Sequence, residues 1–169
     1  SYMESIGCAF GANINAGTGF EQTMYMLNNV PVTREGIIDS SLLILFDWSA
    51  FVTNDPAEID AERGVILEEK RTRDTYQWRQ QVAMMKTLFK GSALENVSLI
   101  GSEENLKNFK PESLVNFYKT WYRPDMQSII VVGDVDAEAV AGKIRDLFGQ
   151  LPKAENPKAK DPVVVPDNV

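Results

Sequence analysis

The sequence has 169 residues, of which 44% are hydrophobic and 24% charged, which are the size and composition of one globular domain. Asp and Glu outnumber Lys and Arg by 24 to 17, and the net charge of −7 argues against nucleic acid or an anionic membrane surface as a partner. The chain contains no histidine and one cysteine, Cys8, which excludes an internal disulfide and any catalytic couple that uses histidine.

The first segment predicts a β-hairpin, with strands at 11–16 and 22–27 around a glycine-rich turn at 17–19. Apolar residues at helical spacing then predict a helix over 33–48. No run of eighteen apolar residues follows here or elsewhere, so we expect no membrane span and a soluble protein, periplasmic or cytoplasmic if bacterial.

The middle of the chain predicts one long helix. Asp55 is a suitable N-cap and Pro56 a suitable first helical residue. The acidic residues come early in the segment and the basic ones late, which complements the helix dipole. We expect this helix to reach about Phe89 and to be followed by a surface loop over 91–110.

The last third predicts a helix from Pro111, a turn at 123–125, a strand at 128–133 and a helix over 136–148. The strand is the strongest strand signal of the chain, because its continuous apolar run suits burial on both faces.

The order of these elements predicts an α+β layer sandwich, in which an antiparallel or mixed sheet carries helices on one face. We expect this domain to occupy residues 1–151, and residues 152–169, rich in proline and lysine, to be a linker towards a following domain. The chain begins with Ser-Tyr-Met-Glu, and we expect it to be a piece of a longer protein, called the parent below.

Two carboxylates of the long helix are candidates for chemistry. Glu62 and Glu69 are seven residues apart and therefore share a helix face, about 10.5 Å apart along the axis, too far to bind one ion together. One of them is a candidate metal ligand and the other an outer residue. The alternative is a structural salt bridge, since Glu69 and Arg73 have the favourable i, i+4 spacing.

Four segments carry a resemblance to a known family: Gly-Ala-Asn-Ile-Asn-Ala-Gly-Thr at 11–18, Glu-Arg-Gly-Val-Ile-Leu-Glu-Glu at 62–69, Phe-Tyr-Lys-Thr-Trp-Tyr-Arg-Pro at 117–124, and the run ending in Gly-Asp at 129–134. In this order they resemble the insulinase/pitrilysin family of zinc metallopeptidases, which includes the mitochondrial processing peptidases. The resemblance implies a half-domain of such a peptidase, cut at its N-terminus.

The resemblance also implies roles for individual residues. Glu69 matches the distal zinc ligand and Glu62 the outer glutamate that supports the site. Asn15, Ala16 and Gly17 match the edge strand along which an extended peptide substrate lies, adding a strand through main-chain hydrogen bonds. From the residues alone, Asn15 is equally well a polar residue beside a turn.

The family's His-x-x-Glu-His motif, which supplies two zinc ligands and the general base, is not in this sequence. We expect it upstream in an active zinc endopeptidase parent; the alternatives are a noncatalytic relative, acting as a peptide-binding or partner-subunit module, and an unrelated α+β domain. The chain by itself then holds no catalytic residue, is inactive, and binds zinc weakly or not at all. The expected partners are a peptide, a second homologous half on the same or another chain, and a second copy of this chain, because missing strands expose sheet edges.

Overall fold

The computed structural model describes residues 11–164 and 166, and these residues form a helix-dominated α+β fold with one small antiparallel sheet. The contacts divide them into two compact units. One unit holds residues 11–53 and 117–157, and the other holds 54–116 and the described residues after 157. Cys8 lies outside the described residues.

The predicted hairpin is confirmed. β1 (Ile14–Thr18) pairs antiparallel with β2 (Thr23–Leu27), and Ala16 lies opposite Tyr25 in the register. The turn lies at 19–22 rather than at the predicted 17–19, because Gly17 and Thr18 still pair with β2.

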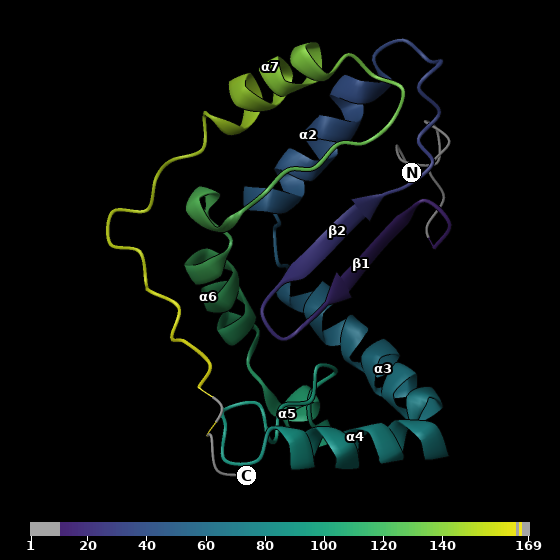
Figure 1. Cartoon of the computed structure of the whole chain (residues 1–169), viewed down its shortest axis with the longest axis vertical. Helices are drawn as coiled ribbons and strands as arrows, with labels where there is room; N and C mark the ends of the chain where they lie inside the picture. The colour runs from purple at the N-terminus through teal and green to yellow at the C-terminus, as the bar shows by residue number, and fades with distance from the viewer. Residues whose placement is uncertain (1–10, 165, 167–169) are drawn as a thin grey trace. The chain divides into compact units, whose positions relative to one another are not determined.

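A helix packs against the hairpin (Figure 1). α2 (Ile37–Ala50) confirms the helix predicted from apolar spacing, although it begins four residues later, after Gly36 in a left-handed conformation. Ile14 of β1 and Ile37 of α2 are the centre of a small core, at 5% and 2% exposure. The partly buried residues that pack against this pair are Leu27, Val30, Ile38, Ile44 and Trp48.

The C-terminal helix of this unit packs along α2 (Figure 1). α7 (Ala137–Phe148) begins where predicted, with the Asp136 side chain accepting a hydrogen bond from the backbone N–H of Ala139. The Phe46 and Phe148 rings meet edge to face at a centroid distance of 5.4 Å. Asp39 of α2 and Lys143 of α7 form an ion pair, about two turns of α2 away from the Phe46 contact. Phe148 and Lys143 of α7 therefore both have partners on α2.

Tyrosine hydroxyls connect the hairpin to the end of α6 (Pro111–Trp121). The Tyr25 hydroxyl lies 2.7 Å from that of Tyr122. The Tyr118 hydroxyl donates to the Trp48 carbonyl at 2.9 Å and accepts from the Val52 N–H at 3.3 Å. The ring centroids of Tyr118 and Tyr122 are 4.4 Å apart, and those of Tyr25 and Trp48 are 5.7 Å apart. We call Tyr25, Tyr118 and Tyr122 the tyrosine cluster.

The tyrosine cluster predicts alkaline sensitivity. Burial, and then the hydrogen bond with Tyr122, raise the pKa of Tyr25 well above its ordinary value of 10. The protonated hydroxyl thus stabilises the folded state fully below pH 10, and this contribution is lost as the pH rises towards the raised pKa. Tyr25→Phe should cost about 1 kcal/mol of unfolding free energy at neutral pH and show a smaller further loss above pH 10. Urea unfolding at several pH values measures both effects.

Tyr76→Phe is the matched control for that experiment, because Tyr76 is 69% exposed. It should unfold like the unsubstituted chain at neutral pH. An alkaline loss of stability equally steep with and without the Tyr25 hydroxyl would contradict the role assigned to the cluster.

The strand predicted at 128–133 is not formed. After the 3-10 turn η1 (Pro124–Met126), residues 127–132 have no regular secondary structure, and Ile130 and Val132 are 78% and 92% exposed. A β-strand needs a neighbour to pair with, and within the described residues no strand lies beside this run. The burial predicted for it is therefore wrong for this chain.

The long helix predicted from Pro56 to Phe89 is two helices, α3 (Pro56–Arg73) and α4 (Tyr76–Leu88). The predicted N-cap of α3 is confirmed, since the Asp55 side chain accepts from the Ala57 N–H at 2.8 Å. The break comes from a second cap, Thr75, whose hydroxyl accepts from the Trp78 N–H at 3.2 Å.

The loop expected over 91–110 contains a short helix, α5 (Glu103–Asn108), before α6 begins at its predicted residue, Pro111. Residues 152–164 and 166 contain no helix or strand. Across the part of the chain that the structure describes, no helix combines the length and apolar character needed to cross a bilayer.

Candidate functional site

The two candidate carboxylates lie on one exposed face of α3. Glu62 and Glu69 are both solvent-exposed, two helical turns apart. Glu69 forms an ion pair with Arg73, with 2.5 Å between the carboxylate oxygen and the guanidinium nitrogen, and 44% of its side chain is exposed. The salt bridge expected as the alternative is thus present. An exposed i, i+4 pair contributes only about 0.3–0.5 kcal/mol, so Glu69 can exchange Arg73 for a stronger partner at small cost.

The neighbouring carboxylate, Glu68, faces a different direction and has its own partner. Two hydrogen bonds join it to the Arg71 guanidinium, at 2.9 and 2.5 Å. These bonds lower the pKa of Glu68 below its ordinary value. Glu68 and Arg71 therefore form a surface pair of the same type as Glu69 and Arg73, on the same helix, which makes them useful controls.

Two cations attach a neighbouring side of α3, about 100° around the helix from Glu62 and Glu69, to the segment 101–109. The Arg63 guanidinium donates to the Leu106 carbonyl at 2.7 Å and to the Phe109 carbonyl at 2.6 Å, and it lies 3.9 Å from the centre of the Phe109 ring. Only 16% of its side chain is exposed. The Lys70 ammonium donates to the Gly101 carbonyl at 2.5 Å.

The side chains of α3 can supply one zinc ligand, Glu69, but not a complete zinc site. A glutamate oxygen is a normal zinc ligand, and Glu69 presents its carboxylate on an open face. Over residues 11–164 and 166, no three His, Cys, Asp or Glu side chains come close enough together to hold a metal. Among these described residues Glu69 is therefore at most a single ligand and does not form a complete metal site.

The second candidate site, at Asn15, Ala16 and Gly17, lies in the other unit, on the exposed strand β1. Backbone bonds from Asn28 to Asn13, and from Gly19 to Gln22, fix which pairs of the hairpin are hydrogen-bonded.

Bonded and non-bonded pairs alternate along an antiparallel ladder, so Asn15 and Gly17 bond to β2 and Ala16 does not. The N–H and C=O of Ala16 therefore point to the open edge of the sheet.

That open edge is partly occupied by the strand's own side chain. The Asn15 Oδ1 accepts a hydrogen bond from the Ala16 N–H at 2.8 Å. No other strand of the described residues pairs with β1. The edge thus has the main-chain groups that strand addition by an extended peptide requires, and one of them, the Ala16 N–H, is satisfied by the Asn15 side chain.

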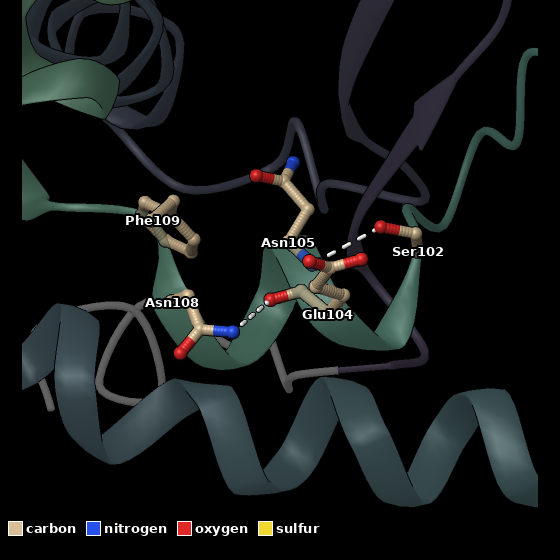
Figure 2. A pocket seen from close by; sticks show the side chains of 5 residues that line it. All are labelled: Ser102, Glu104, Asn105, Asn108 and Phe109. Carbon is tan, nitrogen blue, oxygen red and sulfur yellow. Dashed lines mark hydrogen bonds between the residues drawn. The ribbon is translucent and has the colours of Figure 1, made fainter.

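A small open pocket of about 270 Å³ lies on α5 (Figure 2), lined by Ser102, Glu104, Asn105, Asn108 and Phe109. Ser102 accepts from the Asn105 N–H at 3.0 Å, and the Asn108 amide donates to the Glu104 carbonyl at 2.8 Å. These bonds satisfy the ends of a six-residue helix, so the pocket is explained by local structure and is not a candidate site.

Two functional features were not predicted from the sequence: the anchoring residues Arg63 and Lys70, and the Tyr25–Tyr122 pair. A signal for the first pair was present, since two cations seven residues apart share a helix stripe just as Glu62 and Glu69 do. The contact between Tyr25 and Tyr122 joins residues 97 positions apart, and no local pattern indicates it.

The C-terminal part of the chain, residues 108–169, matches the family model described as the peptidase M16 inactive domain. The probable zinc protease PqqL of Escherichia coli is 34% identical over 150 residues, which are 89% of this chain and 16% of that relative. Among solved structures, the first half of the periplasmic protease PqqL from Escherichia coli has a TM-score of 0.87 and 32% identity, covering 98% of this chain and 34% of that one.

A mutant of the ferredoxin protease FusC, in complex with Arabidopsis ferredoxin, has a TM-score of 0.84 and 25% identity, covering 94% of this chain and 18% of that one. The chain thus spans about one sixth of the length of the protease PqqL it matches. The α+β half-domain expected from the sequence is confirmed by both structural matches. Together with the four sequence segments, these similarities show that the chain belongs to the insulinase/pitrilysin family, the M16 peptidases.

Proposed function

We propose that this chain is part of a zinc-dependent endopeptidase that hydrolyses extended peptides, and that it supplies the distal zinc ligand and the substrate-binding edge strand. The observation that carries the proposal is the Glu69 carboxylate, which lies on an open face of α3 in a chain similar to the zinc protease PqqL. Glu62, two turns away, is the proposed outer residue that supports the ligand without binding the metal.

The reaction needs groups that this chain does not contain. With no histidine in the sequence, two imidazole ligands and the general-base glutamate have to come from elsewhere in the parent. When bound, zinc supplies a Lewis acid that polarises a carbonyl and lowers the pKa of a water molecule. The contribution of this chain is to hold Glu69 in place. Alone it is inactive and, with one carboxylate and no imidazole, a poor zinc site.

The proposed substrate site is the open edge of β1. An extended peptide pairs with Ala16 through its main chain, and its carbonyl replaces the Asn15 Oδ1 at the Ala16 N–H. Gly17 bonds to β2 and keeps the strand in register. Because these hydrogen bonds involve only main-chain groups, they do not select for a peptide sequence. Any sequence preference has to come from contacts with the peptide side chains.

Cleavage of an extended peptide by the parent tests this function, with Ala16→Pro as the variant. Proline removes the N–H that faces the open edge and leaves the hairpin ladder intact. The loss of one main-chain hydrogen bond should lower kcat/KM about tenfold, mainly through KM.

Ala16→Val keeps the N–H and is the control, with an expected change below about twofold. Absence of zinc-dependent cleavage by the parent would refute the function, and equal kcat/KM for the proline and valine variants would refute the role of the edge.

The proposed partner, besides the peptide, is a second homologous half, on the same chain or another subunit. The relative PqqL is known as a structure of its first half and as a whole protease, which supports this arrangement. The Escherichia coli relative is a periplasmic protease, which favours the periplasm over the cytoplasm as the compartment of the parent.

We also propose that the isolated chain self-associates. The apolar run that includes Ile130 and Val132 has exposed aliphatic side chains, and no strand of the described residues pairs with it. Light scattering should show dimers or larger species, and Ile130→Lys should shift them towards monomer while Val65→Lys on α3 should not. A monodisperse monomer at moderate concentration would contradict self-association.

A second candidate function is a noncatalytic binding or partner-subunit module of the same family. The match of residues 108–169 to a domain described as inactive favours it. The two candidates differ in whether the parent binds zinc through Glu69.

A further inference from the structure

The attachment of α3 to the segment 101–109 depends on two side chains of one helix stripe. Arg63 and Lys70 are seven residues apart, and two helical turns take 7.2 residues, so their side chains leave α3 on nearly the same side. Arg63 donates to the carbonyls of Leu106 and Phe109, and Lys70 donates to that of Gly101. The two attachment points are therefore about 10.5 Å apart along the axis.

Apolar packing does little to fix the rotation of this helix about its axis. None of the 18 residues of α3 is buried. Of its large apolar side chains, Val65 is 57% exposed, and Ile59, Ile66 and Leu67 are only partly covered. A helix held by a buried apolar stripe cannot turn without exposing that stripe, but within the described residues of this chain α3 has no such restraint. Its charged anchors have to supply it.

The direction in which Glu62 and Glu69 leave the helix is determined by the position of the anchors, Arg63 and Lys70, through helical geometry. Glu62 and Glu69 each precede an anchor by one residue, which places them about 100° around the helix from Arg63 and Lys70. With the anchors bound to 101–109, this face remains open to solvent, as the exposure of Glu69 shows.

We propose that Arg63 and Lys70 are positioning residues, which fix the rotation of α3 and thereby the direction in which Glu69 projects towards a bound zinc ion. This inference rests on the proposed function of Glu69 and adds two residues that do not touch the metal.

The sign of the effect separates positioning from simple electrostatics. Removing a positive charge near a cation site should strengthen cation binding if charge alone matters. If Lys70 instead fixes the rotation of α3, its removal should weaken zinc binding even though the loss of a positive charge by itself favours the cation. Arg71 is the matched control, because this arginine of the same helix is 74% exposed and bonds to Glu68.

The experiment measures zinc affinity of the full parent by competition with a chelator, together with hydrogen exchange of the amides at 101–109. The variants are Lys70→Met, Arg63→Lys, which keeps the charge but loses the planar fork, and Arg71→Met as control. We expect zinc binding about tenfold weaker in the first two, as for residues that orient a metal ligand, and faster exchange at 101–109. The control should bind zinc as tightly as the parent or slightly more tightly.

Zinc binding unchanged or tightened in both Lys70→Met and Arg63→Lys would overturn the inference, and so would unchanged exchange at 101–109. Glu69→Gln in the same assay distinguishes failure of the positioning role of Arg63 and Lys70 from failure of the ligand role of Glu69. If it weakens zinc binding while the anchor variants do not, only the positioning role fails. If it has no effect, the proposed function of Glu69 fails, and the inference with it.

Discussion

Glu69→Gln in the parent is expected to weaken zinc binding by more than about 100-fold and to abolish peptide cleavage. The substitution keeps the size of the side chain and removes the anionic oxygen that zinc requires. Replacing partners that merely orient a ligand already costs 10–100-fold, so loss of a direct ligand should cost more. The fold should be unaffected, because the ion pair with Arg73 that is lost is exposed and weak.

Glu68→Gln is the control for that prediction. Glu68 is the adjacent residue, it is also paired with an arginine of α3, and its side chain leaves the helix about 100° away. Zinc affinity within about twofold of the parent is expected for it. Equal losses in the two variants would mean that the total charge of the helix, and not one ligand, determines zinc binding.

Arg63→Ala is expected to be the most destabilising single substitution on α3, at about 2–4 kcal/mol. It leaves the partly buried carbonyls of Leu106 and Phe109 without their charged donor and removes the guanidinium that covers the Phe109 ring. Thermal unfolding of the chain and hydrogen exchange at 101–109 measure the effect.

Arg71→Ala should change stability by less than about 0.5 kcal/mol, because the Arg71 side chain is 74% exposed and pairs with Glu68 on the surface. Destabilisation of similar size in the two alanine variants would show that the attachment of α3 does not depend on the two hydrogen bonds of the Arg63 guanidinium.

The parts of the fold that sequence predicts well are those determined by neighbours in the chain. Asp55 caps the helix that it was expected to cap, and the helix expected over 136–148 begins at Asp136, because a cap needs only its own side chain and an N–H two or three residues on. Two strand-like runs around a glycine-rich turn predict the hairpin, but the predicted turn begins two residues too early because Gly17 and Thr18 suit a strand end as well as a turn.

The errors have two different causes. The break at Thr75 was a local signal that a continuous helical pattern outweighed, although threonine is a good N-cap. The strand at 128–133 failed for a non-local reason: its apolar run has the right composition, but pairing depends on a neighbouring strand that the described residues do not supply.

In the candidate site, too, the features determined by neighbours in the chain were predicted and the others were not. Helical spacing correctly placed Glu62 and Glu69 on one face and anticipated the ion pair of Glu69 with Arg73. The roles of the two carboxylates came from the family resemblance, since an exposed ion pair has the same spacing whether or not it serves a metal. The open edge at Ala16 required the register of the hairpin, which sequence does not determine to one residue.

The role of Glu69 as a zinc ligand is tested most directly by a crystal structure of the zinc-loaded parent, with data collected at the zinc absorption edge to locate the metal. We expect an anomalous peak about 2.0–2.2 Å from a Glu69 carboxylate oxygen, with Arg73 released from it and Glu62 outside ligand distance. A peak bound by other residues, with Glu69 still paired to Arg73, would show that Glu69 is not a zinc ligand.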